Sequence, residues 1–401
     1  MPLNRRTFLS LGGTVVLPRV TLAAPTPSGA PDARFLLVFL RGGYDAMSLL
    51  VPAQSAFYRD VRPAIAIPTG DSQGAQALDT DWSWHPAVAS KLQGLWEAKQ
   101  LAFVPFAGTD DISRSHFETQ DSIELGQSLG GQRDFNSGFL NRLAAQLASH
   151  AGATPSAMSF TDQLPTVFRG PTSVPNLPLK GRAGQDVPVK LQSAVQSMYA
   201  HHALVDKISE GFEVRQQVMQ DYAAEMDAAS RRAINASGFE TQARRVARLM
   251  RERYALGFID VGGWDTHVNQ GNTTGYLATQ LGNLAQGLQA LSQEMGEVAW
   301  RKTVVVVVSE FGRTLRENGN RGTDHGHGSV YWVLGGGLNG GRVSGEQQTI
   351  EARTLFQNRD LPVLNDYRSV LGGLLQRQFG LSNKALDATF PGARPQDLRL
   401  L

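Results

Sequence analysis

The sequence predicts an α/β fold in which a mostly parallel sheet is flanked by helices. Short apolar runs, typical of strands buried on both faces, alternate along the chain with helix-favouring stretches. Hydrophobic residues make up 41% of the 401 residues, enough to bury a large core. We therefore expect one large domain over residues 25–401, with a helical insertion or cap at about residues 190–254.

The first residues predict an export signal. Arg5 and Arg6 stand in the pattern NRRTFLS, a short apolar run follows to Val16, and small residues at 21–24 suit a signal peptidase. The run is far shorter than the ~20 residues that span a bilayer. An ordinary basic amphipathic terminus is the alternative. We expect a cleaved twin-arginine signal at residues 1–24, the twin-arginine translocase as a partner, and a periplasmic or secreted mature protein without a transmembrane segment.

Composition excludes several classes of function. Removing residues 1–24 takes three arginines and no acidic residue from a chain of net charge +2, which leaves the mature chain near −1. That balance gives no reason to expect nucleic acid or an anionic membrane as a partner. The absence of cysteine excludes disulfides, thiolate metal ligands and a cysteine nucleophile.

The expected strands are four apolar runs, at residues 34–40, 101–105, 255–259 and 303–308. Between the last two runs, apolar residues recur three and four positions apart, which places them on one face of a helix that packs on the core. They are Leu277, Leu281, Leu284, Leu288, Leu291, Met295 and Val298. Strand, helix and strand in this order form a right-handed crossover, so the two strands run parallel and end at one edge of the sheet.

Acidic residues follow three of these strands at that edge. Asp45 ends the segment RGGYD after the first strand, Asp265 and His267 lie in GGWDTH after the third, and Glu310 begins EFGR after the fourth. Ligands of open α/β sheets bind outside the carboxyl ends of strands, where loops converge. A solvated Asp in a tight turn is the alternative for each motif taken alone. Their joint placement favours a metal site.

The segment GTDHGHG supplies three more potential ligands, Asp324, His325 and His327. Carboxylate oxygen and imidazole nitrogen together suit Zn, Mn or Fe better than Ca or Mg. A solvated polar turn is the alternative interpretation of this segment. We expect one or two divalent ions held by some of these residues. Since metal–ligand bonds are ~2 Å and paired ions lie ~3.5 to 4 Å apart, a shared centre requires His267 and His325 to lie within about 12 Å of each other.

A candidate nucleophile follows the second strand, in the segment SRSHFETQD at residues 113–121. Ser115 is expected at a helix N-terminus, where free N–H groups and the helix dipole favour an anion. A plain N-cap is the alternative for this serine. Arg114 or Arg313 would hold an oxyanion, and His116 is a metal ligand, a general acid or a packed side chain.

Taken in order, the twin-arginine signal and the segments RGGYDAMSLLVP, SRSHFETQD, DVGGWDTH, VVSEFGRT and GTDHGHG resemble a widely exported bacterial family, domain of unknown function 1501, of the alkaline phosphatase and sulfatase superfamily. The resemblance covers nearly the whole chain. It implies a three-layer alkaline phosphatase-like fold with a one- or two-metal centre at the strand ends. It also implies Ser115 as nucleophile, with Ser113 as the alternative, and metal ligands among Asp45, Asp265, His267, Asp324, His325 and His327.

Two departures from the superfamily bear on the site. Where a metal-binding pair is usual after the penultimate strand, this chain has Glu310-Phe311, and phenylalanine cannot bind a metal. One ligand then comes from the Asp324 segment, or one of two metal sites is missing. The serines at 113 and 115 also lack the proline of the motif from which sulfatases make formylglycine, which disfavours that branch.

The function expected is an exported metal-dependent hydrolase of phosphate or sulfate esters, on a small-molecule or glycan substrate. An ion held by the acidic and histidine residues above, Glu310 included, would activate Ser115 for in-line attack. The alternative is a catalytically inactive metal-binding or surface-assembly protein on the same fold. Glu310-Phe311 is the best sequence support for that alternative.

Overall fold

The computed structural model describes residues 32–70, 73–151, 156–179, 231 and 233–401. Both the predicted signal at residues 1–24 and most of the predicted insertion lie outside these residues. Only the end of that insertion is described, and most of it forms helix α8 (Phe239–Glu252). The division into a signal, a domain and a cap therefore stays a prediction.

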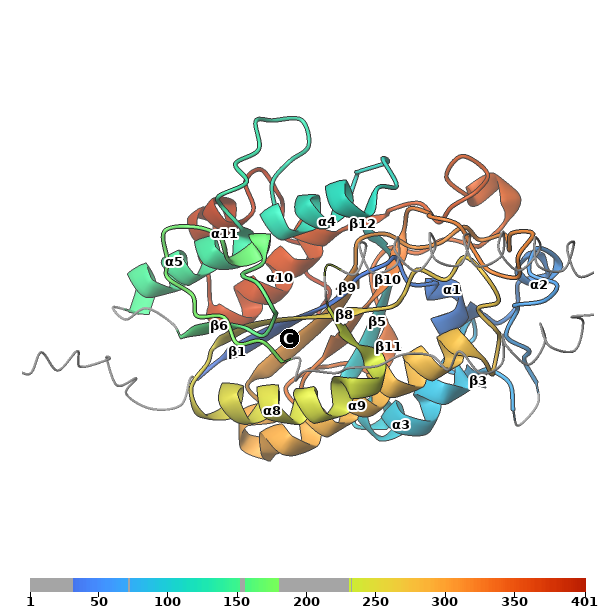
Figure 1. Cartoon of the computed structure of the whole chain (residues 1–401), viewed down its shortest axis with the longest axis horizontal. Helices are drawn as coiled ribbons and strands as arrows, with labels where there is room; N and C mark the ends of the chain where they lie inside the picture. Colours follow the sequence, from blue (N-terminus) through green and yellow to red (C-terminus); the bar gives the residue numbers. More distant parts are fainter. Residues whose placement is uncertain (1–31, 71–72, 152–155, 180–230, 232) are drawn as a thin grey trace, which may run out of the picture.

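A mostly parallel sheet forms the centre of the molecule, as the sequence predicted (Figure 1). Within the described ranges it has nine strands, of which β10 alone runs antiparallel to its neighbours. Seven follow one another across the sheet, and two short strands pair beside them. They are β11 (Arg342–Val343), β5 (Leu101–Gly108), β10 (Ser329–Leu334), β9 (Thr303–Ser309), β1 (Arg34–Leu40), β8 (Leu256–Gly262) and β6 (Ala157–Ser159), with β12 (Asn365–Asp366) beside β5 and β7 (Ile234–Asn235) beside β8.

Helices cover both faces of this sheet, which gives three layers (Figure 1). One face carries α3 (Pro86–Glu97), α8 and α9 (Tyr276–Trp300), and the other carries α4 (His116–Leu125), α5 (Phe139–Ala151), α10 (Tyr367–Phe379) and α11 (Asn383–Thr389). The side chains of β1 alternate between two cores. Leu36, Val38 and Leu40 join the core under α9, whereas Phe35, Leu37 and Phe39 join the core under α10.

Shorter elements complete the described chain. They are helices α1 (Ala46–Leu49) and α2 (Ala56–Asp60), the 3₁₀ turns η1 (Thr166–Phe168), η2 (Ala236–Gly238) and η3 (Ala352–Thr354), and a small antiparallel sheet of β2 (Leu50–Pro52), β4 (Trp82–Trp84) and β3 (Gln76–Ala77). No helix in the described part of the chain combines the length and hydropathy that a bilayer crossing requires.

The predicted strands and the helix α9 are confirmed, with one residue as an exception. β8 and β9 run parallel, and β1 lies between them and pairs with both. Six residues of the predicted apolar stripe on α9, from Leu277 to Met295, are buried. Val298 is 80% exposed, so its assignment to the core was wrong. Gly296 has a non-helical φ of 71°, and this kink rotates the last turn out of the register of the stripe.

Candidate metal centre

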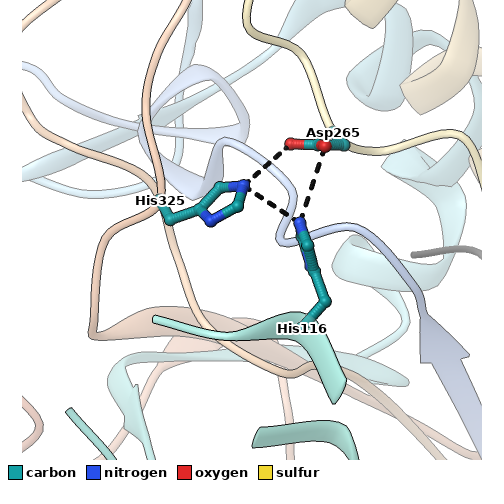
Figure 2. A group of neighbouring side chains, drawn as sticks. All are labelled: His116, Asp265 and His325. Carbon is teal, nitrogen blue, oxygen red and sulfur yellow. Dashed lines mark hydrogen bonds and ion pairs between the residues drawn. The ribbon is translucent and has the colours of Figure 1, made fainter. Parts of the chain in front are cut away.

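The loops at the carboxyl ends of four strands meet at one edge of the sheet. β1, β8 and β9 are parallel, and β5 points the same way because both β5 and β9 pair antiparallel with β10. His116 is the first residue of α4 after β5, Asp265 follows β8, and His325 lies in the loop that connects β9 to β10. Figure 2 shows these three side chains pointing at one another.

The three side chains form a group that can hold a metal ion. Nε2 of His116 lies 3.0 Å from Nε2 of His325 and 3.5 Å from an oxygen of Asp265. Nε2 of His325 lies 3.3 Å from the other Asp265 oxygen. One potential ligand atom from each residue falls within 4.8 Å of the other two (Figure 2). No second group of this kind is found among the described residues.

His267 adds a fourth donor to this group. Its Nε2 lies 3.0 Å from Nε2 of His325 and 2.9 Å from Asp265 Oδ1. The separation of His267 and His325 is thus well inside the limit that a shared centre sets. His267 and His325 are about one-fifth exposed, whereas His116 and Asp265 are buried, so one side of the group faces solvent.

The spacing of the donors fits a small divalent ion. A tetrahedral ion with bonds of about 2.0 to 2.1 Å has ligands about 3.3 to 3.4 Å apart. Five of the six pairwise separations among these four residues run from 2.9 to 3.5 Å. Three imidazole nitrogens and one carboxylate form a donor set that suits Zn, Mn or Fe.

Each histidine is oriented through its other ring nitrogen. Nδ1 of His116 lies 2.8 Å from Glu310 Oε1, and Nδ1 of His325 lies 3.0 Å from the backbone oxygen of Arg114. Nδ1 of His267 lies 3.2 Å from Asp324 Oδ1. All three partners accept hydrogen bonds only, so each Nδ1 carries a proton and donates it. The three Nε2 atoms are therefore left to serve as ligands, the arrangement usual for metal-binding histidines.

Three neutral imidazoles in this arrangement would point lone pairs at each other across 3.0 Å. A cation between them removes that repulsion, and in the absence of a metal a proton does so. Burial opposes the charged form of His116, but its hydrogen bonds to Asp265 and Glu310 raise its pKa to about 9. The carboxyl of Asp265 is also buried, yet Arg313 and the three histidines hold its pKa far below the usual range. The centre therefore attracts a positive charge.

Arg313 closes one side of the group. It is fully buried, and its guanidinium donates to the carbonyls of Gly42, Gly43 and Thr323, to Asp265 Oδ1, and to His267 Nε2 at 3.3 Å. These contacts use all five N–H donors of the side chain. Four acceptors belong to the scaffold or to Asp265, and only the fifth is a nitrogen that a metal would take.

Asp45 lies outside this group. Both of its oxygens bond to Arg62, at 2.6 and 3.0 Å, and Oδ2 also accepts from Ser48 and Gln270. Burial alone would raise the pKa of Asp45, but the charge of Arg62 and these hydrogen bonds lower it. Gln270 in turn accepts from Thr266, so the Asp45 network supports the Asp265 loop from beneath. Asp45 is thus held in a salt-bridge network outside the converging group, whereas the resemblance implied a metal ligand.

The serines and Arg114 lie beside the centre, at the start of α4. Ser115 is the N-cap of α4, and its hydroxyl accepts from the Glu118 amide at 3.5 Å. Ser113 lies two residues earlier, and its hydroxyl accepts from the Ser115 amide at 3.2 Å and lies 3.5 Å from Thr119 Oγ1. The side chain of Arg114 pairs with the buried Asp360 at 2.7 Å, so its contribution to the centre is its backbone oxygen, bonded to His325.

Some of the remaining candidates bond to the histidines of the group, and others do not. Glu310 and Asp324 contact His116 and His267 through Nδ1, so they support ligands and are not part of the converging set. His327 lies apart, with its ring 4.8 Å from that of Phe356. Phe311 packs against His116 and His325, with ring centres 4.9 and 5.1 Å away, and its apolar ring offers no ligand atom there.

Sequence reasoning missed the partners of these side chains. Arg62, Gln120, Gln270 and Asp360 each hold a candidate residue in place. Of these four residues, only Gln120 could have been predicted from the sequence. It stands four residues after His116 and therefore lies on the same face of α4. Arg62, Gln270 and Asp360 come from loops and short elements whose positions no residue spacing predicts.

Comparisons with known proteins give one protein-family match and distant likenesses among solved structures. A protein-family model described as "Protein of unknown function (DUF1501)" matches residues 32–390. No curated protein is similar enough in sequence to match. Among solved structures, a protein in the alkaline phosphatase superfamily from Vibrio parahaemolyticus is 8% identical, with a TM-score of 0.39 over 87% of this chain and 67% of that one. The lipoteichoic acid synthase LtaP from Listeria monocytogenes is 8% identical, with a TM-score of 0.35 over 92% of this chain and 76% of that one. A 2-O GAG sulfatase is 11% identical, with a TM-score of 0.36 over 91% of this chain and 75% of that one.

Proposed function

Because the chain belongs to the DUF1501 family, whose description names no activity, we propose from its own site that it is a metal-dependent hydrolase of phosphate or sulfate esters. The observation that carries this proposal is the convergence of His116, His267, His325 and Asp265 at the strand ends, with one side open to solvent. A structural metal site is usually closed by its ligands, whereas a catalytic site keeps an open position.

The three histidines would hold one divalent ion, with Asp265 as the fourth ligand or as a bridge to Arg313. The mixed nitrogen and oxygen donors favour Zn, Mn or Fe. Such an ion would act as a Lewis acid on an ester oxygen and lower the pKa of an attacking hydroxyl. The single group of ligands among the described residues supports one ion, consistent with Phe311 in the place of a further ligand.

Arg313 would hold the anionic part of the ester. Four of its donors are bound to the carbonyls of Gly42, Gly43 and Thr323 and to Asp265, which fixes the guanidinium rigidly. Its fifth donor points at His267 Nε2. Once that nitrogen serves as a ligand, the N–H loses its acceptor and is placed at the edge of the centre to donate to an ester oxygen.

Ser115 is the proposed nucleophile. It directly precedes His116 and caps α4, where the free N–H groups and the dipole favour a negative charge. Its hydroxyl would release its proton to solvent, and attack by the oxygen on phosphorus or sulfur would break the bond to the alcohol oxygen of the ester, which takes a proton from solvent and leaves as the alcohol. Water would then release phosphate or sulfate and restore the serine hydroxyl. The reaction consumes one water and involves no oxidation or reduction.

The proposed setting is the periplasm or the cell exterior, after export by the twin-arginine translocase. The arginine pair at residues 5 and 6 supports this, as does a metal centre that would be loaded before export. A small-molecule or glycan ester is the proposed substrate.

A metal-binding or surface-assembly protein without turnover is the second candidate. The observation that favours it is the contact of Asp265 with all three histidines, because an ion bound by all four would have a closed shell. Spectroscopy of the cobalt-substituted protein would distinguish the two, since an exchangeable solvent ligand is present only in an open centre.

The test is elemental analysis of natively exported protein, followed by assays on phosphate and sulfate esters. We expect one equivalent of Zn, Mn or Fe per chain, loss of metal and activity in His325→Ala, and retention of metal without activity in Ser115→Ala. A well-folded protein that neither contains nor takes up a transition metal would refute the hydrolase. Metal with no turnover on any ester would favour the second candidate.

A further inference from the structure

A chain of buried polar side chains leads from the metal centre into the sheet. Arg41 Nη1 donates to Gln120 Oε1 at 2.9 Å, and Gln120 Nε2 donates to Glu310 Oε1 at 2.8 Å. The same oxygen of Glu310 lies 2.8 Å from His116 Nδ1. All four residues are at most 5% exposed. Since water does not reach these groups, each must find its partner within the protein.

At the end of this series far from the metal centre, Arg41 fixes the direction of the hydrogen bonds. Arg41 follows β1 directly, and its Nε and Nη2 are bound to Asp260 at 2.7 Å and to Glu124 at 2.9 Å. A guanidinium only donates hydrogen bonds. The carboxamide of Gln120 therefore has to present its oxygen to Arg41, which directs its NH₂ group at Glu310.

At the end near the metal centre, the donors around Glu310 fix the direction of the hydrogen bonds in the same way. Glu310 Oε1 accepts from the Gly42 amide at 2.8 Å as well as from Gln120, and Oε2 accepts from Ser309 at 2.8 Å. Glu310 is therefore surrounded by donors and serves as their acceptor. His116 can then only donate from Nδ1, which leaves Nε2 to face His325 and Asp265.

We propose that Gln120, oriented by Arg41, is a positioning residue that holds Glu310 against His116 Nδ1 and thereby presents His116 Nε2 as a metal ligand. This inference deepens the proposed metal centre and rests on it. It gives a role to two residues that touch neither the ion nor the ester. Outer partners of this kind typically change metal affinity by about 10- to 100-fold.

The experiment measures zinc affinity, by competition with a chromophoric chelator, in the parent chain and in Gln120→Met. Methionine has nearly the volume of glutamine but neither its donor nor its acceptor. We expect the variant to bind one equivalent of zinc about tenfold more weakly. In the zinc-loaded parent, ¹H NMR should show a slowly exchanging Nδ1 proton of His116, assigned by its loss in His116→Gln. That proton should exchange faster in Gln120→Met.

Asn141→Leu is the matched control. Asn141 is equally buried, but its carboxamide bonds to the backbone of Phe168 and Thr172 and not to a histidine, to Glu310 or to the Asp265 loop. We expect its His116 proton to behave as in the parent. Should Gln120→Met not fold, Gln120→Asn replaces it. Asparagine keeps the carboxamide but is one methylene shorter, so it cannot bond to both Arg41 and Glu310 as Gln120 does.

An unchanged zinc affinity together with an unchanged Nδ1 proton in the folded Gln120 variant would overturn the proposal. An equal loss of zinc affinity in Asn141→Leu would also overturn it, because the effect would then come from buried amides in general. If the parent binds zinc and responds to Gln120→Met but cleaves no ester, the positioning role stands and the hydrolase proposal fails.

Discussion

His267 and His325 face each other with their Nε2 atoms 3.0 Å apart, although 58 positions separate them in the chain. Their Nδ1 atoms are bound to Asp324 and to the Arg114 carbonyl, so neither ring can turn to place an N–H between the two nitrogens. Two lone pairs held in this way favour a cation. The contact therefore makes His325 a candidate ligand, whereas Asp324 in the same loop supports His267.

We predict that His325→Ala and Asp324→Asn will differ in kind. His325→Ala removes a ligand nitrogen and should abolish stoichiometric zinc binding. Asp324→Asn removes only the carboxylate that orients His267, so it should still bind one equivalent, about tenfold more weakly. Chelator competition and elemental analysis of the two variants measure this. Equal loss of zinc in both would mean that Asp324 is itself a ligand.

The α/β class and the parallel central strands could be predicted because buried strands and amphipathic helices have distinct residue periods. Runs such as the valines of β9 need no tertiary information to be recognised. Val298 was misplaced because the kink at Gly296 changes the helix phase, and a glycine within a helix does not reveal its φ angle.

The site was harder to predict at the level of single residues. The strand ends identified the loops that meet at this edge, and His116, Asp265, His267 and His325, whose side chains converge there, were all among the candidates. Which carboxylates point inward depends on partners distant in sequence. Asp45 is bound by Arg62, and Glu310 is held by the Gly42 amide and Gln120, and no motif in the sequence encodes these contacts.

The buried pair of Asp45 and Arg62 predicts a pH-dependent stability. The pKa of Asp45 is lower in the folded protein than in the unfolded chain, where it is ~3.9. The carboxylate of Asp45 therefore contributes fully to the free energy of unfolding above this pH. The contribution is lost as the pH falls through the lower pKa of the folded protein. Urea unfolding should therefore show a stability advantage of the parent over Asp45→Asn at pH 7 that shrinks at more acidic pH. A constant difference down to the acid transition would contradict the assignment.

Removing the other member of this pair should cost more. Arg62→Met leaves the Asp45 carboxylate buried without its cation, which typically costs about 3 to 5 kcal/mol. Asp45→Asn in the same background should recover part of this loss, because it removes the unpaired charge. The free energy of unfolding of the single and double variants forms the test. If the double variant is no more stable than Arg62→Met, the two side chains are not coupled.

Gly42 predicts a link between backbone packing and metal binding. A Cβ at this position would lie 2.7 Å from the Asp265 amide nitrogen, and its φ is +122°. Gly42→Ala should displace the Asp265 loop and lower zinc affinity as well as stability. Gly70→Ala is the control, because Gly70 has a φ of +90° with no atom within 4 Å of a Cβ. It should cost only backbone strain, about 1 to 3 kcal/mol, and leave zinc affinity unchanged.

The last prediction separates the two roles of Ser115. Ser115→Ala loses the N-cap of α4 as well as the hydroxyl, and should destabilise the protein by about 1 kcal/mol. Ser115→Asn restores a side-chain oxygen that can cap the helix, so its unfolding free energy should approach that of the parent. If the hydroxyl is the nucleophile, both variants should bind metal and neither should hydrolyse esters. If Ser115 is only a cap, Ser115→Asn should be active and stable together. Turnover by the asparagine variant would therefore assign the attack to water, because no hydroxyl remains at position 115 to form a covalent intermediate.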